Sequence, residues 1–235
     1  ISIKNIYENL LIKTNTTNNI SKINIRDTLP YIFNNIHEYH DYTFQVFNKK
    51  NVGVNKFVGV YYDFGTSINK SALNYIYITL FDKYISENFF DSLRTKQQLG
   101  YSVISEHSSF RFFGQSFDMF VFRVISSSFD TSHIKSQIKE FISEIKNIIF
   151  DKNKFDKILN NYLVLLEDPF LTIYDEYNHY LRQIKTYKQT NEEFFNKSKN
   201  YAKLINDGTV TFEGFIKFIE IYILNNQRNF TLTIE

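Results

Sequence analysis

The chain contains 235 residues, with 27 Lys and Arg against 25 Asp and Glu, and its formal net charge of +2 excludes the basic excess typical of nucleic-acid-binding proteins. It has no cysteine, which excludes disulfide scaffolds, thiolate nucleophiles and cysteine-ligated metal sites. Hydrophobic residues make up 43% and aromatic residues 18%, so the composition indicates a folded globular chain. No apolar run approaches a membrane span, and we expect neither a nucleic-acid partner nor a membrane-spanning segment.

The first part of the chain has the character of a connector. A short apolar-periodic stretch over residues 6–12 predicts a small helix, and Pro30 suits the first turn of a second helix that runs to about His40. We therefore expect residues 1–41 to form a connector and linker helix from a preceding domain, and residues 42–235 to form the main domain.

Strand patterns and one long helix follow. Alternating β-branched and aromatic residues over 42–48 and 54–64, separated by a polar turn, predict a β-hairpin. Apolar residues spaced by three and four over 73–93 predict a helix, and the strand patterns over 101–105 and 118–127 predict two further members of the sheet.

The second half of the chain is mostly helical. A strongly amphipathic pattern covers residues 134–149, and further helices are predicted over 153–167, 171–187, 190–207 and 211–224. An alternating stretch at 230–234 predicts a last strand that returns to the sheet. Strands first and helices afterwards predict an α+β fold, an antiparallel sheet with helices packed on one face.

The histidines suggest no metal site by themselves. Two of them lie in the segment His37–Asp41, but their spacing matches neither H-E-x-x-H nor H-x-x-E-H, so we interpret this segment as a surface or helix-end cluster. The other three are isolated and are interpreted as structural: His107, His133 and His179. We expect no metal ligand and no cofactor-binding residue in this chain.

The most informative segment is Phe89–Val103. Read from spacing alone, it is a helix end in which Arg94 and Lys96 complement the helix dipole, Gly100 takes the C′ position and Tyr101 opens a strand. Arg94 and Tyr101 nevertheless flank a single turn. A guanidinium and a phenol are both hydrogen-bond donors, so they could converge on one oxygen, as an oxyanion site requires.

The run from Phe90 to Val103 resembles the hallmark of the insulinase-like (pitrilysin, or inverzincin) metallopeptidases in the C-terminal half of insulin-degrading enzyme and its relatives, approximately F-x-x-L-R-T-K-E-Q-L-G-Y-x-V. The resemblance implies the last domain of a zinc endopeptidase whose zinc lies in the N-terminal half of the same polypeptide. It also implies that Arg94 and Tyr101 bind the peptide substrate and the transition state, and that the fragment alone is inactive.

One residue departs from that pattern, and two other interpretations stay open. Gln97 stands where the family has Glu, which removes a charge near the turn but neither proposed donor. The same fold also occurs in non-catalytic scaffold or assembly subunits. A third interpretation is an unrelated aromatic-rich binding module in which the Arg94 and Tyr101 turn only ends a helix.

Overall fold

The computed structural model describes residues 10–13, 40–46, 55–64, 71–112, 115–167, 170, 172–182, 191–226 and 228–234. Within these ranges, six strands form one sheet in the order β1-β2-β6-β3-β5-β4. The strands are β1 (Leu10–Lys13), β2 (His40–Val46), β3 (Lys56–Asp63), β4 (Ser102–Phe112), β5 (Gln115–Ser126) and β6 (Asn229–Ile234). Every neighbouring pair is antiparallel except β2 and β6, which are parallel.

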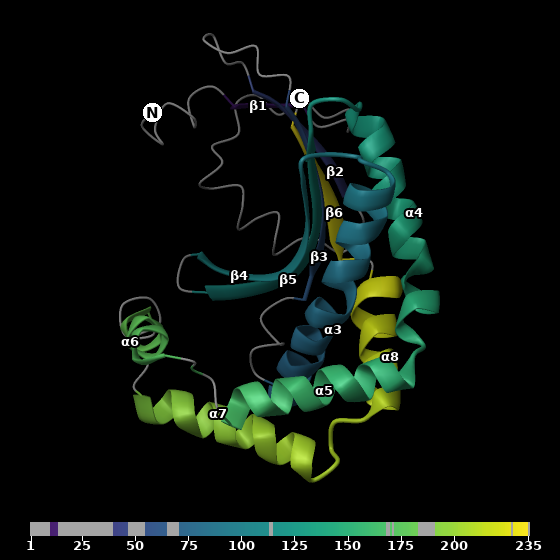
Figure 1. Cartoon of the computed structure of the whole chain (residues 1–235). Helices are drawn as coiled ribbons and strands as arrows, with labels where there is room; N and C mark the ends of the chain where they lie inside the picture. The colour runs from purple at the N-terminus through teal and green to yellow at the C-terminus, as the bar shows by residue number, and fades with distance from the viewer. Residues whose placement is uncertain are drawn as a thin grey trace.

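The helices cover one face of this sheet, as Figure 1 shows for α3, α4 and α8. Helices α5 and α7 lie together across one end of that layer (Figure 1). The helical elements are α3 (Ala72–Phe90), η2 (Asp91–Lys96), α4 (Thr131–Ile149), α5 (Lys152–Glu167), α6 (Ile173–Arg182), α7 (Asn191–Asn206), α8 (Phe212–Ile219) and η4 (Glu220–Leu224). The α+β fold with helices on one face is thus confirmed.

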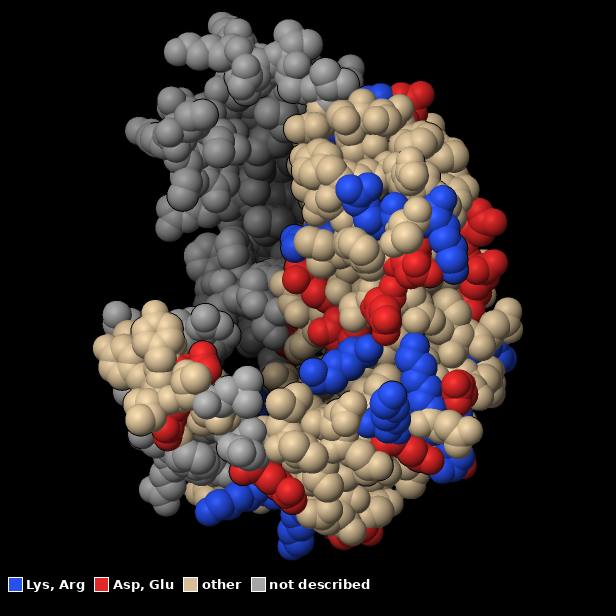
Figure 2. Space-filling view, viewed as in Figure 1, with Lys and Arg blue, Asp and Glu red and all other residues tan. Residues whose placement is uncertain are grey.

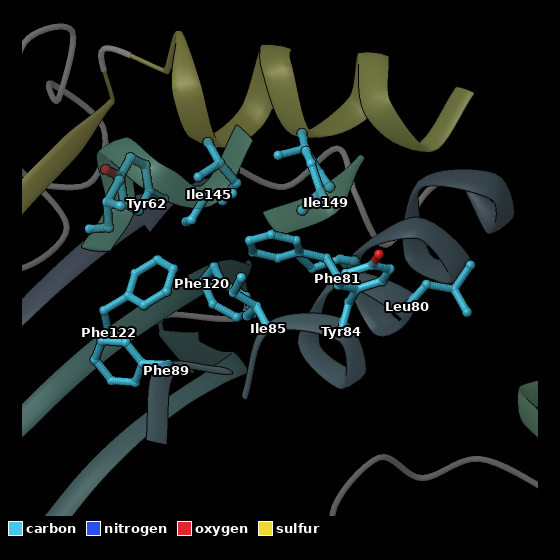
Figure 3. Close-up of a cluster of buried hydrophobic side chains, with 14 of the residues drawn as sticks. Tyr62, Leu80, Phe81, Tyr84, Ile85, Phe89, Phe120, Phe122, Ile145 and Ile149 are labelled. Carbon is cyan, nitrogen blue, oxygen red and sulfur yellow. The ribbon is translucent and has the colours of Figure 1, made fainter. Parts of the chain in front are cut away.

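The core lies between the sheet and these helices, and aromatic rings fill much of it. Phe81 and Phe89 of α3 contact Phe120 and Phe122 of β5, with ring centroids 4.7 and 5.3 Å apart (Figure 3). The predicted apolar stripe of α4 is buried as expected: Ile134, Ile138, Phe141, Ile142, Ile145 and Ile149. Apolar residues that alternate along the strands therefore pack against apolar residues spaced by three and four along the helices, and together they form a single core.

Two expectations about the first part of the sheet are wrong. The strands predicted as a hairpin, β2 and β3, are not neighbours, because β6 lies between them and pairs with both. Residues 10–12, expected at the end of a small helix over 6–12, belong to strand β1 (Leu10–Lys13), which pairs with β2. Of the helix predicted from Pro30, the structure describes only His40, as the first residue of β2. The division at residue 41 stays a prediction.

The surface seen in Figure 2 carries lysine and arginine interspersed with aspartate and glutamate, with no large area of one sign. Ion pairs among the described residues include Lys96–Asp91 and Lys152–Asp156, each with an N–O distance of 2.9 Å. Among the helices that the structure describes, none is long and apolar enough to cross a lipid bilayer.

Candidate functional site

Helix α3 changes geometry where the informative segment begins. From Asp91 to Lys96 the backbone forms a π-helical turn, η2, which carries Arg94. The backbone N–H of Gln97 donates to the carbonyl of Ser92 at 3.2 Å, one residue further than in an α-helix. π-helical turns are rare and occur frequently at functional sites. A second one, η4, follows α8, so the geometry marks η2 as an unusual turn, and the choice of Arg94 within it rests on the sequence motif.

The chain then reverses direction through a left-handed residue, Gln98, whose φ is 52°. The N–H of Leu99 closes the reversal by donating to the carbonyl of Leu93 at 2.8 Å, and both leucine side chains are buried in the core. The expectation that Gly100 takes the left-handed C′ position is therefore wrong, because Gln98 occupies that conformation and a buried leucine follows it.

Gly100 is required for a different reason. A Cβ atom at this position would lie 2.3 Å from the carbonyl oxygen of Ile125 on β5, so only glycine lets the turn approach that strand. The same carbonyl accepts a hydrogen bond from the N–H of Tyr101 at 3.1 Å, while Ser102 is the strand partner of Ile125. Two consecutive residues thus face one residue of β5, the arrangement of a β-bulge.

The bulge explains the orientation of Tyr101. By simple alternation Tyr101 would share the side of Val103, which is 3% exposed within the core. Tyr101 is instead 56% exposed, because the extra residue breaks the alternation where the strand begins. The phenol therefore faces solvent at the junction of η2 and β4.

Arg94 and Tyr101 lie on the two sides of this reversal, as the sequence indicates. Arg94 is half-buried on η2, and Tyr101 is exposed. Among the described residues, neither the guanidinium nor the phenol has a hydrogen-bond or ion-pair partner. Gln97 is exposed, and its neighbour Lys96 is paired with Asp91 within the turn. Both donors are thus available to a ligand, and their convergence on one oxygen stays a prediction.

A second cluster of titratable residues, further along α3 and β4, was not predicted from the sequence. Asp82 on α3 accepts a hydrogen bond from the backbone N–H of His107 on β4, and the imidazole Nε2 lies 3.4 Å from Oδ1 of the fully buried Asp118 on β5. Burial raises the pKa of Asp82 to about 6. In the sequence, the only sign of this cluster was one carboxylate within the apolar pattern of the helix, and a carboxylate there equally suits a solvent-exposed position on that helix.

The other histidines behave as structural residues. His133 stacks on Phe129 at 5.1 Å, and His179 contacts the ring of Phe170 at the same centroid distance. His40 and Asp41 open β2, and the rest of their predicted cluster lies outside the described residues. No group of three histidine or carboxylate residues in the described part of the chain could hold a metal ion, so we derive no metal chemistry from this chain.

Comparisons with known proteins bear on the segment that contains this site. Residues 80–163 match the family model of the PQQ synthase PqqF-like C-terminal lobe, domain 4. The matched range contains η2, the reversal and strands β4 and β5. No curated protein matches the chain at the level of sequence.

Solved structures share the fold over most of the chain. Pitrilysin matches with 16% identity and a TM-score of 0.59 over 84% of this chain and 19% of its own. A protease from Helicobacter pylori matches with 12% identity and a TM-score of 0.60 over 84% of this chain and 44% of its own. The inactive peptidase domain of a protein assigned as a zinc protease, from Bordetella parapertussis, matches with 8% identity and a TM-score of 0.54 over 80% of this chain and 96% of its own.

The chain therefore spans about a fifth of the length of pitrilysin and less than half that of the Helicobacter pylori protease. The resemblance to the insulinase-like metallopeptidases is confirmed, in sequence over the segment that carries the motif and in fold over most of the chain.

Proposed function

We propose that this chain is the C-terminal, non-zinc-binding domain of an insulinase-like zinc endopeptidase, and that it helps to close the chamber in which peptides are hydrolysed. The partners of this domain are then the peptide substrate and the N-terminal catalytic half of the same polypeptide. As the family resemblance implies, the zinc of such an enzyme belongs to that other half, where it would polarise the scissile carbonyl. The isolated domain is expected to be inactive.

Within this proposal, Arg94 and Tyr101 are donors to the substrate. The guanidinium presents several N–H groups in a fixed fork and stays protonated, and the phenol presents one O–H. Both can donate to backbone carbonyl oxygens of a bound peptide and to an oxygen that gains negative charge during hydrolysis. Donors held in place before the reaction are most effective. The π-helical turn, the buried leucines and the bulge fix the backbone that carries these two side chains.

One observation carries the proposal. A guanidinium and a phenol stand on either side of one chain reversal, without a partner among the described residues, within the segment that matches the PqqF-like C-terminal lobe family. A turn that served only to end a helix would need neither side chain. Leu93, Leu99 and Gly100 already provide the capping hydrogen bond and the close approach to β5.

The test is peptide hydrolysis by the full-length protein that contains this chain. Arg94→Ala and Tyr101→Phe are each expected to lower kcat about 100- to 1,000-fold, the typical cost of one lost transition-state donor. Lys96→Ala is the matched control, because Lys96 lies on the same turn but is exposed and paired with Asp91, and it should leave kcat unchanged. Wild-type turnover in both test variants would refute the assigned roles.

A non-catalytic scaffold or assembly subunit with the same fold is the alternative. The observation that favours it is the match to a structure described as an inactive peptidase domain, which is similar in length to this chain. A full-length protein that hydrolyses no peptide, and whose assembly is lost when the Arg94 turn is altered, would support this second function.

A further inference from the structure

A buried carboxylate and a histidine face each other between β4 and β5. The side chain of Asp118 is fully buried, and its Oδ1 lies 3.4 Å from Nε2 of His107, whose side chain is only 12% exposed. A buried carboxylate is costly unless a positive charge compensates it. His107 can supply that charge only when its imidazole is protonated, and histidine is the side chain whose charge ordinarily changes between about pH 5 and 8.

A second basic side chain, Lys197 on α7, acts on the same carboxylate. Burial lowers the pKa of Lys197, and the negative charge of Asp118 opposes this shift. The ammonium group lies 4.5 Å from the ring centroid of Tyr75 on α3 and 5.7 Å from that of Tyr201 on α7. Burial raises the pKa of Tyr201, so that phenol stays neutral. Two aromatic faces and a carboxylate thus attract the charged lysine and help to hold α7 on α3.

The ring of Tyr75 connects the two basic side chains. Its centroid lies 5.9 Å from that of His107, with the ring planes at 80°, and the ammonium group of Lys197 lies over the same ring. When His107 is protonated, two positive charges share one aromatic ring and one buried carboxylate. Like charges in a partly buried site repel each other, so each disfavours the other. The imidazole faces Asp118 directly, and it is therefore Lys197 that loses attraction.

The other ionisable groups around His107 belong to α3, β4 and β5. Asp82 accepts the backbone N–H of His107 and is also affected by Glu106 and Lys83, while Glu106 is paired with Arg123 at 2.8 Å. Burial raises the pKa of Asp82 to about 6, so Asp82 titrates in the range of an ordinary histidine. An experiment on His107 must therefore distinguish the protonation of these two residues.

We propose that His107 and Lys197 alternate as the cation that compensates Asp118, so that protonation of His107 loosens the first half of α7. Near neutral pH the uncharged imidazole leaves Asp118 to Lys197, which holds this half of the helix on α3. In acid the charged imidazole pairs with Asp118 and repels Lys197. The second half of α7 is held separately, because Tyr201 is buried in the core. This pH response does not depend on the peptidase function proposed above.

Amide hydrogen exchange of the full-length protein at two pH values tests the proposal, after correction for the intrinsic pH dependence of exchange. Lowering the pH from about 7.5 to about 5.5 should reduce the protection of amides 195–199 about three- to tenfold and leave that of amides 202–206 unchanged. His107→Gln, which cannot become charged, should keep the same protection at both pH values. Asp82→Asn should retain the wild-type response, because Asp82 bonds to β4.

A matched pair of lysine variants provides a second readout. Lys197→Met removes the competing charge, so the midpoint of His107 protonation should lie at least about one pH unit higher than in the wild type. Exchange of the imidazole C2 hydrogen, followed by mass spectrometry, measures this midpoint. Lys199→Met should leave it unchanged, because Lys199 is exposed on the same helix. Circular dichroism checks that the variants fold.

Three results would overturn the proposal. The first is equal protection of amides 195–199 at both pH values in the wild type. The second is a pH response that survives in His107→Gln or disappears in Asp82→Asn, because the titrating group would then not be His107. The third is an equal shift of the His107 midpoint in both lysine variants, which would reflect net charge and not the position of Lys197. The first measurement needs no variant, so it decides the matter even if a variant fails to fold.

Discussion

Replacing Asp82 by asparagine tests how strongly burial opposes a charge at this position on helix α3. Burial raises the pKa of this carboxyl from 3.8 to about 6, against the attraction of His107 and with a smaller contribution from Glu106. A difference of about two pKa units corresponds to about 3 kcal/mol. Because the native-state pKa lies above the unfolded-state value, ionised Asp82 destabilises the fold above about pH 6, and this cost disappears as the pH falls below about 4.

Asp82→Asn keeps an oxygen that can accept the His107 N–H and removes the charge. We expect it to raise the free energy of unfolding by about 2–3 kcal/mol at about pH 8, with a smaller gain near pH 6 and none near pH 4. Urea denaturation at these pH values measures the difference. Tyrosine fluorescence can follow it, because the chain contains 17 tyrosines and no tryptophan.

Asp207→Asn is the control for this experiment. Hydrogen bonds from the hydroxyl and the backbone N–H of Thr209 hold the pKa of the exposed Asp207 carboxyl below its usual value, so its replacement should cause a small loss of stability at about pH 8. If Asp82→Asn instead destabilised the protein at about pH 8, or changed its stability equally at every pH, the argument from burial would be refuted.

Three further changes follow from the site and the core. Gly100→Ala should destabilise the protein by about 1–3 kcal/mol in chemical denaturation, since its Cβ would meet the Ile125 carbonyl at 2.3 Å; wild-type stability would contradict the close approach. Gln98→Gly should be neutral or stabilise by up to about 1 kcal/mol in the same assay, because glycine adopts the positive φ without strain. Thr211→Ala should cost about 1 kcal/mol, because its hydroxyl accepts the Gly214 N–H at 3.0 Å at the start of α8; an unchanged denaturation midpoint would mean that this cap contributes nothing.

Local patterns predicted most helices and several strands. Helix α4 follows from isoleucines spaced by three and four, and the Thr211 cap of α8 follows from one hydroxyl and its spacing to Gly214. These features depend on residues within one or two turns, so a single sequence contains all that is needed to predict them. The motif around Arg94 and Tyr101 was likewise found from about fourteen adjacent residues.

Features that depend on distant segments could not be predicted in this way. The β2 and β3 patterns favour a hairpin, but β6, from the far end of the chain, enters between them, and no local pattern records that pairing. Nothing in the sequence of α3 distinguishes Asp82 from an exposed helical aspartate. Its pKa is raised only because the fold buries it against β4.

The reversal beside Arg94 shows most clearly which features the sequence predicts and which depend on the tertiary structure. The sequence by itself determined that a helix ends there, that glycine stands in the turn and that a guanidinium and a phenol flank it. Only the tertiary structure decided that Gln98 takes the left-handed conformation and that Gly100 makes room for the carbonyl of Ile125. The physical reason is that glycine is favoured both where the backbone needs a positive φ and where another chain segment approaches closely. The sequence does not say which of the two applies to Gly100, because the atom that decides it, the carbonyl oxygen of Ile125, belongs to another strand.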